Sequence, residues 1–182
     1  MKKLIFFTIL TSSFSFAQNA ELKGVITYFF NDNFGFKPDV GATIYIIEGD
    51  EENEAYNSIK DFQRQKKLTS AYLDVLSSDK KLKNKEKKQK KEEANKILEE
   101  KTNAALSSIF QIEISKSYKE LLMADGDGNF SAILPEGDYI VIAISKNRND
   151  LNVAEIKGKI DCRHIVISNE KTVYNVNFEF DL

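Results

Sequence analysis

The chain has 182 residues, 42% of them hydrophobic and 30% charged, and a formal net charge of −2. This length suits one domain with its own hydrophobic core, and the near balance of charge gives no general reason to expect a nucleic-acid partner. The single cysteine, Cys162, excludes an intramolecular disulfide, so the packed core must supply the stability. A buried thiol is the usual state of such a residue, although pairing between chains is an alternative.

The N-terminus has the pattern of a secretory signal peptide. Lys2 and Lys3 precede the apolar run 4–10, and small residues follow as far as Ala17, after which we expect cleavage. The run is too short for a comfortable membrane span, and a retained anchor helix is the alternative. A lipoprotein would need a cysteine at the cleavage site, and none is there. We therefore expect an exported protein, periplasmic or secreted, with a mature domain of residues 18–182.

The first part of the mature chain is predicted to form strands. Residues 22–30 are rich in β-branched and aromatic side chains, which favour a strand. Residues 31–33, Asn-Asp-Asn, form a turn, and residues 37–41, Lys-Pro-Asp-Val-Gly, form a second turn. Residues 42–47 are then the second strand.

A long segment at about residues 50–123 differs from its flanks, because it is rich in lysine and glutamate and contains neither Gly nor Pro. It holds 16 basic and 14 acidic residues, whereas the rest of the mature chain holds 8 basic and 14 acidic residues. Residues 77–79, Ser-Ser-Asp, break its helical periodicity and could cap a second helix. The segment predicts an inserted antiparallel helical hairpin, a short coiled coil, with these residues on its apolar faces: Ala55, Ile59, Phe62, Thr69, Tyr72 and Leu76, then Ala94, Leu98, Ala105, Ile109 and Ile112.

Residues 108–116 are left open between helix and strand. Phe110–Ile114 alternates apolar and polar side chains as a strand does, so the second helix could end near Ser107.

The C-terminal part is again predicted to be strands. Residues 130–134 and 139–144 are separated by a Pro-Glu-Gly-Asp turn and predict a hairpin, and strands are expected near 153–157 and 160–167. The last strand, 174–182, places every second side chain on an apolar face. Six or seven short strands indicate an antiparallel β-sandwich, so the fold is expected to be mainly β with an α insertion.

The two flanking blocks resemble the carboxypeptidase regulatory-like domains. The residues that carry the resemblance are Gly24-Val25-Ile26, Pro38-Asp39-Val40-Gly41-Ala42-Thr43-Ile44-Tyr45, Ala124-Asp125-Gly126-Asp127-Gly128-Asn129-Phe130 and Leu134-Pro135-Glu136-Gly137-Asp138-Tyr139-Ile140-Val141. The resemblance implies a transthyretin-like (prealbumin-like) antiparallel sandwich of about 83 residues. It does not cover the insertion. In metallocarboxypeptidases such a domain is an accessory to a catalytic domain, which is missing from this sequence.

The sequence offers few residues that could form a catalytic site. A catalytic zinc site commonly needs two or three histidines, and the chain has one, His164. Cys162 and His164 share one face of a predicted strand, but the strand rise separates them by about 6–7 Å, too far for a nucleophile and its base in most rotamers. We expect a non-enzymatic protein without a cofactor.

One turn has the oxygen ligands of a weak calcium site. Asp125, Asp127 and Asn129 occupy the first, third and fifth positions of a loop with EF-hand spacing. The sixth position, which should be Gly, is Phe130, so an ordinary polar turn is the favoured interpretation and metal binding is the alternative.

The predicted tip of the hairpin is strongly basic, and it is the expected contact with a protein or an anionic envelope component. The lysines expected to make this contact are Lys80, Lys81, Lys83, Lys87, Lys88, Lys90 and Lys91. A solvated tip without a partner is the plain alternative. The function we expect is therefore an exported binding or assembly module. The alternative function is carbohydrate or small-ligand binding by the sandwich loops 31–36 and 146–152, where Phe34 and Phe36 could stack on a sugar.

Overall fold

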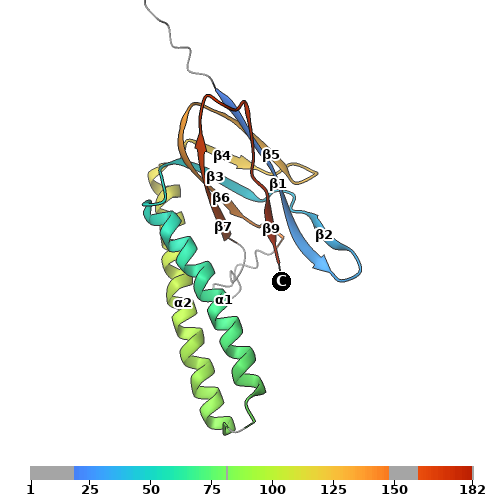
Figure 1. The fold of residues 1–182 in the computed structure, drawn as a ribbon, viewed down its shortest axis with the longest axis vertical. Coiled ribbons are helices and arrows are strands. Elements are labelled where there is room, and N and C mark those ends of the chain that lie inside the picture. Colours follow the sequence, from blue (N-terminus) through green and yellow to red (C-terminus); the bar gives the residue numbers. More distant parts are fainter. Residues whose placement is uncertain (1–18, 81, 148–159, 182) are drawn as a thin grey trace, which may run out of the picture.

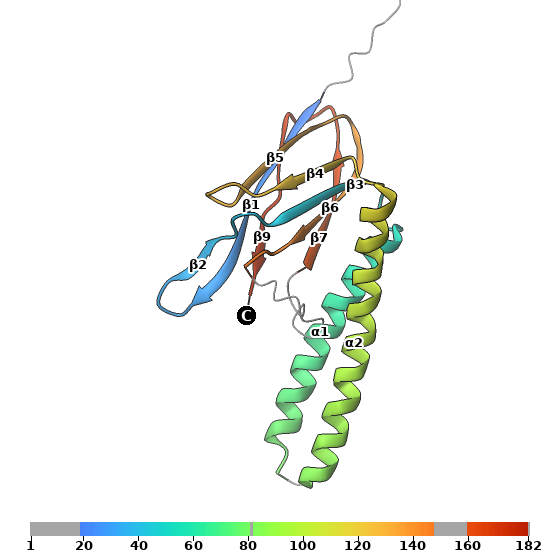
Figure 2. The ribbon, with the colours of Figure 1, turned by 180° about the vertical axis from the view of Figure 1, so that it is seen from behind.

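The computed structural model describes residues 19–80, 82–147 and 160–181. Two β-sheets pack face to face, and a long helical arm lies against one of them and extends beyond it (Figures 1 and 2). The predicted signal peptide, Lys81 and the strand expected at 153–157 lie outside the described residues.

The first sheet is built around β1 (Ala20–Asn31). β2 (Gly35–Pro38) and β5 (Asn129–Leu134) pair with it antiparallel, while β8 (Val173–Asn175) and β9 (Phe178–Phe180) pair with it parallel. The prediction of a wholly antiparallel sandwich is therefore wrong for this sheet. The reason is that the chain returns to the start of β1 before β8, where Glu21 donates a backbone hydrogen bond to Thr172, and then runs alongside β1 in the same direction.

The strand predicted at 174–182 is in fact β8 and β9, separated at Val176. Val176 crosses directly over Gly24, where an added Cβ would lie 1.7 Å from the Val176 carbonyl oxygen, so a side chain at position 24 would push the two strands apart. The predicted alternation is still present, because Val176, Phe178 and Phe180 are buried and their neighbours are exposed.

The second sheet has the order β4 (Glu120–Met123), β3 (Thr43–Glu48), β6 (Gly137–Ile144) and β7 (Ile160–Ile167), all antiparallel. β4 pairs with β3 although it lies within the segment assigned to the insertion. β2 was not predicted, and its last two residues, Lys37 and Pro38, lie in the predicted turn 37–41. The predicted hairpin of 130–134 with 139–144 is wrong, because β5 and β6 belong to different sheets. The turn between them carries the chain across the sandwich, and Tyr139 Oη donates a 3.1 Å hydrogen bond to the Pro135 carbonyl oxygen there.

The core of the sandwich lies between the inner faces of the two sheets. Leu22 and Ile26 of β1, Phe178 of β9, and Ile44 and Val141 of the second sheet are all completely buried. Burial of such side chains is worth about 1.5–3 kcal/mol each relative to exposure.

The arm consists of α1 (Glu54–Ser78) and α2 (Asn84–Ser115), which follow β3. Asn53 caps α1 by accepting hydrogen bonds from the N–H groups of Ala55 and Tyr56. The second helix does not begin at the Ser77–Asp79 break, because its N-cap is Lys83. It continues through the ambiguous segment to Ser115, where Lys116 adopts a left-handed conformation with φ 50°. No helix in the described ranges is long and apolar enough to cross a membrane.

Candidate functional site: the helical arm

The base of the arm forms a third layer over the outer face of the second sheet. Ala55, Ile59 and Phe62 of α1 are buried, and together with Leu98 and Ile109 of α2 they belong to a second hydrophobic core. The sheet contributes to this core the side chains that point away from the sandwich interior: Tyr45, Ile47, Ile140, Ile142, Ile160 and Cys162. The second sheet is therefore buried on both faces, and the arm is fixed to the sandwich at its base.

Polar contacts fix α1 to the edge strand β7. Lys60 Nζ donates a 2.8 Å hydrogen bond to the Cys162 carbonyl oxygen, and Gln63 Nε2 donates to the Ile160 carbonyl oxygen at 3.3 Å. Gln63 also contacts the Asp161 carboxylate. Strand edges expose unpaired backbone groups that attract other strands, so these side chains protect the edge while they orient the helix.

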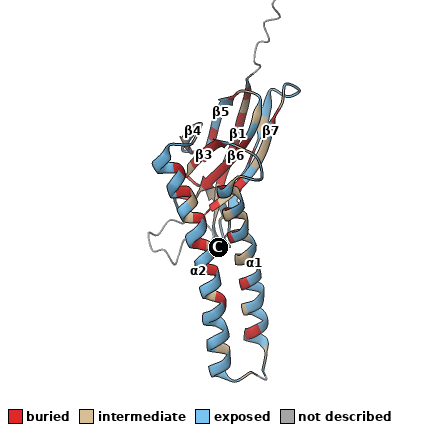
Figure 3. Ribbon diagram, turned by 90° about the vertical axis from the view of Figure 1, so that its left-hand side faces the viewer, coloured by how far each residue is buried: buried red, intermediate tan, exposed pale blue. Residues whose placement is uncertain are grey.

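Beyond the sandwich, residues 68–97 form what we call the distal arm. Its buried residues are Thr69, Leu76 and Ala94, and the two apolar ones, Leu76 and Ala94, belong to neither hydrophobic core. Most of the distal arm is exposed, with a thin line of buried positions between the helices (Figure 3). This part of the molecule extends from the sandwich and is not needed to cover its sheets.

One side of the distal arm exposes apolar side chains. Leu68, Tyr72 and Val75 are 54%, 42% and 68% exposed and follow one another at steps of four and three residues on α1. Ile97 of α2 is 43% exposed and shares with Leu68 and Tyr72 a shallow cavity of about 380 Å³ between the helices. We call Leu68, Tyr72, Val75 and Ile97 the apolar stripe. Three- and four-residue spacing places the three α1 residues on one face, as in a helix that packs against a neighbour, and the shared cavity places Ile97 beside Leu68 and Tyr72.

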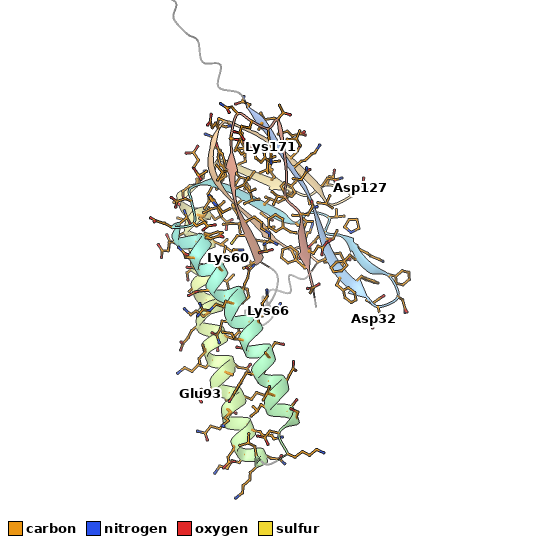
Figure 4. All side chains as sticks on the ribbon, viewed as in Figure 1. Asp32, Lys60, Lys66, Glu93, Asp127 and Lys171 are labelled. Carbon is orange, nitrogen blue, oxygen red and sulfur yellow. The ribbon has the colours of Figure 1, made fainter. Side chains whose placement is uncertain are left out.

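The apolar stripe faces away from the sandwich. Leu68 lies five residues after Gln63, which turns it about 140° around the helix from the side that contacts β7. Lys66 lies on the sandwich side. Burial lowers the pKa of its ammonium group, and this effect is larger than the opposing effect of the Asp181 charge. Figure 4 shows Glu93, another residue of the cavity, on the opposite side of the arm from Lys66. The stripe is therefore accessible to another molecule.

Charge changes sign along α2 in the distal arm. Residues 85–91 contain five lysines and one glutamate, whereas residues 92–100 contain four glutamates and one lysine. Lys90 and Glu93, one from each block, both line the cavity beside the apolar stripe. The stripe is thus bordered by a basic block toward the tip and an acidic block toward the base.

The predicted tip lysines occupy different positions. Lys80 is exposed in the connection between the helices, Lys83 is the N-cap of α2, and Lys81 lies outside the described residues. Lys87 Nζ donates a 3.3 Å hydrogen bond to the Ser77 carbonyl oxygen, and Lys88 lies 3.9 Å from Glu92. Lys90 and Lys91 are exposed on α2, and of these two Lys90 borders the cavity.

Cys162 and His164 do not form a catalytic pair. The Cys162 side chain is buried under α1, with Sγ 3.9 Å from the Tyr56 carbonyl oxygen, and burial raises the pKa of this thiol to about 12. His164 instead contacts carboxylates, with Nε2 3.1 Å from Asp138 and Nδ1 3.6 Å from Glu51. A nucleophilic cysteine needs a lowered pKa, so this thiol is a core residue.

The acidic turn at Asp125 is stabilised by its own backbone. Asp125 Oδ1 accepts hydrogen bonds from the N–H groups of Asp127 and Asn129 at 2.9 and 2.8 Å, and these bonds lower the pKa of Asp125. Gly128 completes the turn with φ +78°, and an added Cβ there would lie 2.5 Å from the Ile26 carbonyl oxygen. In the described part of the chain, no group of three His, Cys, Asp or Glu side chains is arranged to hold a metal ion.

The β1–β2 hairpin carries the aromatic residues of the alternative hypothesis. Phe34 and Phe36 are 67% and 45% exposed. Phe34 meets Phe30 edge-on at 67°, and Lys37 Nζ lies 3.8 Å from the Phe30 ring centre. These rings form an exposed cluster and not a flat stacking surface. The second loop of this hypothesis, residues 146–152, is described only as far as Asn147.

The apolar stripe was not predicted, although its residues are visible in the sequence. Tyr72 was assigned to the buried face, but it is 42% exposed. The predicted apolar faces do not include Leu68, Val75 and Ile97, because the prediction assumes a single apolar face on each helix. A second set of apolar residues about 100° from the first is the signal that could have revealed a surface for a further partner.

Comparisons with known proteins do not assign this chain to a family. No protein family and no curated protein matches the sequence. Among solved structures, a protein from Pseudomonas aeruginosa with a provisional description as carbohydrate binding is 8% identical, with a TM-score of 0.42 over 90% of this chain and 89% of the other. The pilus backbone of Streptococcus pneumoniae is 12% identical, with a TM-score of 0.36 over 90% of this chain and 41% of the other. The full-length major pilin of the same organism is 13% identical, with a TM-score of 0.31 over 89% of this chain and 30% of the other. These values are too low to carry an argument about fold or function.

Proposed function

We propose that this protein is an exported, non-catalytic binding module whose distal arm docks onto a protein partner. The observation that carries the proposal is the apolar stripe on an arm that is fixed at its base and extends away from the sandwich. A two-helix hairpin alone has no need for a second exposed apolar face, whereas a third or fourth helix packed on that face would remove it from water.

The tip lysines have a supporting part in this proposal. Lys80, Lys83, Lys88, Lys90 and Lys91 surround the end of the arm, and Lys81 belongs to the same run in the sequence. Charges at the rim of an interface mainly speed association and select the partner, while apolar groups at its centre supply affinity. We expect the lysines to attract acidic groups next to the apolar stripe.

The sandwich architecture supports the resemblance to the carboxypeptidase regulatory-like domains. We infer a carboxypeptidase regulatory-like sandwich that serves as scaffold for the arm. The hydrogen bond from Tyr139 Oη to the Pro135 carbonyl oxygen, within the turn that carries the resemblance, supports this inference. Export rests on the N-terminal pattern, with cleavage after Ala17.

Affinity capture from a cell-envelope extract tests the proposed function. The bait carries Leu68→Lys and Val75→Lys, and the matched control carries Phe110→Lys and Ile114→Lys, which are exposed to a similar extent at the base of the same arm. We expect the first pair to lose the partner and the control pair to retain it. Equal capture by both baits would contradict docking on the apolar stripe. Removal of the whole segment 50–123 is unsuitable as a test, because it also removes β4 and the third layer.

Binding of a small hydroxylated ligand is the second candidate function. A cavity of about 640 Å³ on the first sheet is lined by polar side chains that can donate to or accept from hydroxyl groups, among them Lys23, Asp125, Asn129, Asn175 and Asn177. We expect a binding saccharide to perturb the NMR signals of Asn129 and Asn175 and not those of Phe34. Perturbation centred on Phe34 and Phe36 would instead assign binding to the β1–β2 hairpin.

A further inference from the structure

We propose that the end of the arm binds the surface of a membrane rich in anionic phospholipid, with the arm standing end-on to the lipid headgroups. We call residues 79–91 the basic tip, because they contain eight lysines against one aspartate and one glutamate, a net charge of +6. The basic tip lies at the end of the arm that is farthest from the sandwich (Figure 1). This inference goes beyond the proposed function, because it uses the basic tip and not the apolar stripe.

Most lysines of the basic tip face water. Six of them are exposed: Lys80, Lys83, Lys85, Lys88, Lys90 and Lys91. Among the described residues, Lys88 is the only one of these six with an ion pair, at 3.9 Å from Glu92, and its side chain is still 80% exposed. An ion pair so exposed contributes little to stability. The ammonium groups can therefore meet an external anion without the loss of a strong contact.

These lysines point in different directions around α2. Because each residue turns a helix by about 100°, Lys90 and Lys91 lie about 140° and 240° around the axis from Lys85. Seven residues separate Lys91 from Asn84, where α2 begins, so the lysines lie within about 10 Å of the end of the arm. One surface patch on a protein would reach only some of them. A plane of phosphate groups met end-on is within reach of all of them.

The residue types of the basic tip suit phosphate headgroups. The basic tip contains neither arginine nor an aromatic residue. Lysine binds phosphate as a point charge, without the fixed geometry of a guanidinium group, which suits an array of mobile headgroups. Proteins that bind single-stranded nucleic acid also use aromatic side chains on which bases stack, and the basic tip has none.

The charge pattern along α2 favours the end-on orientation. The basic tip is followed directly by the acidic block 92–100, which has four glutamates and one lysine. An arm that lay flat would bring this block to the anionic surface, where like charges repel. An arm that stands end-on keeps the acidic block behind the lysines.

The length of the arm keeps the acidic sandwich away from the same surface. Outside residues 50–123, the mature chain holds 8 basic and 14 acidic residues. Among the α1 residues that line a cleft with Asp181 of the sandwich, Ser70 is nearest to the tip. From Ser70, α1 continues for eight residues to Ser78, about 12 Å, which exceeds the Debye length of about 8 Å at physiological ionic strength. Repulsion between the sandwich and the membrane is therefore largely screened.

Co-sedimentation with lipid vesicles tests the binding. The mature chain is mixed with vesicles of phosphatidylcholine alone, or of phosphatidylcholine with phosphatidylglycerol. We expect binding to the second kind only, and we expect it to weaken as salt is added. The variant Lys80→Gln/Lys85→Gln/Lys91→Gln should bind about a hundredfold more weakly, since each lysine near an anionic surface contributes roughly a factor of five.

A matched control separates the basic tip from net charge. Lys67→Gln/Lys96→Gln/Lys171→Gln also removes three exposed lysines, and it changes the net charge by the same amount. These lysines lie away from the end of the arm, so this variant should bind within about twofold of the parent chain. Circular dichroism checks that both triple variants keep the helical content of the parent chain.

Fluorescence quenching tests the orientation. A fluorophore is attached at Asn84→Cys, the first residue of α2, or at Asn103→Cys, nineteen residues further along the helix and about 28 Å away. Both positions are exposed, and the native Cys162 is buried. A spin label on the lipid headgroup should quench the fluorophore at position 84 and not at position 103.

Three results would overturn the inference: no binding to the anionic vesicles, an equal loss of binding with both triple variants, or equal quenching at positions 84 and 103. Binding of soluble inorganic polyphosphate without binding to anionic vesicles would also overturn it, since the basic tip would then recognise phosphate but not a membrane.

The outcomes also separate this inference from the proposed function, because the variant of the basic tip leaves the apolar stripe unchanged. If vesicle binding fails and the apolar stripe still captures a protein, the proposed function stands and this inference fails. If the basic tip binds vesicles and capture is independent of the apolar stripe, this inference stands and the proposed function fails.

Discussion

Lys60 on α1 donates a 2.8 Å hydrogen bond to the backbone carbonyl of Cys162 on β7, more than a hundred residues later in the chain. This contact joins the arm to an edge strand of the sandwich, and the Cys162 side chain packs beneath the same helix. The arm thus leaves the sandwich in a fixed direction, and its distal half, residues 68–97, presents the apolar stripe away from the sandwich.

The buried base of the arm should contribute strongly to stability. Phe62 is 1% exposed between α1 and the second sheet, so Phe62→Ala should lower the free energy of unfolding by about 3–5 kcal/mol through lost burial and an internal cavity. Urea denaturation followed by circular dichroism measures this change. If Phe62→Ala unfolds no more easily than the parent chain, the arm is not packed on the sheet as described.

The apolar stripe should contribute little to the stability of the monomer. Val75 is 68% exposed, so Val75→Lys should change the free energy of unfolding of the monomer by no more than about 0.5 kcal/mol. The same denaturation experiment measures this change. A large decrease in the free energy of unfolding would mean that Val75 stabilises the fold. The exposure of the stripe would then no longer indicate a binding surface.

The Cys162 thiol should be unreactive in the folded protein. Burial raises its pKa to about 12 from an ordinary value near 9, so the folded state holds the proton that the unfolded state releases. The thiol should therefore react slowly with an aromatic disulfide reagent at pH 8 and rapidly after denaturation. Stability should also decrease as the pH rises from about 9 toward 12. Rapid reaction of the native protein at pH 8 would show that the thiol is accessible and would reopen a catalytic role.

The turn at Asp125 should depend on the ionised carboxylate. Backbone hydrogen bonds lower the pKa of Asp125 in the folded state, so its stabilising effect is present above the unfolded pKa and is lost as the pH falls below about 4. Asp125→Ala should lower the thermal midpoint at pH 7, and the difference from the parent chain should shrink in acid. A midpoint of the parent chain that rises on addition of calcium would revive the metal-binding alternative.

Much of the architecture could be predicted from local patterns. The apolar faces of both helices were correct at Ile59, Phe62, Leu98 and Ile109, because helical periodicity extends over many residues and averages out exceptions. The strands β3, β5, β6 and β7 were found because β-branched runs bounded by turns are distinctive.

The errors arose where tertiary pairing decides the structure. β4 carries the sequence Glu-Leu-Leu-Met, which has no strand signal of its own and is a strand because it pairs with β3. The assignment of β5 and β6 to one hairpin failed because a short turn looks the same in sequence whether the chain stays in one sheet or crosses to the other. Parallel pairing of β8 and β9 with β1 also leaves no local mark.

One signal for the position of the arm was present in the sequence. Ile44–Ile47 and Ile140–Ile144 are continuous apolar runs without the alternation of a strand that has one solvated face. Such runs indicate strands buried on both sides, and the structure shows that the second cover is the base of the arm. The apolar stripe was harder to predict. Single exposed apolar residues are common on protein surfaces, so those on a helix indicate a binding surface only once the buried face of that helix is known.

Photo-cross-linking from residue 72 tests most directly whether the distal arm docks onto a protein. A photoreactive phenylalanine derivative replaces Tyr72 in the stripe or, as control, Ile133 on the outer face of the first sheet, which at 62% is more exposed than Tyr72 at 42%. After illumination of cells that produce the protein, we predict a specific protein adduct from position 72 and none from position 133. Absence of an adduct at position 72, or the same adduct from both positions, would contradict the binding role of the distal arm.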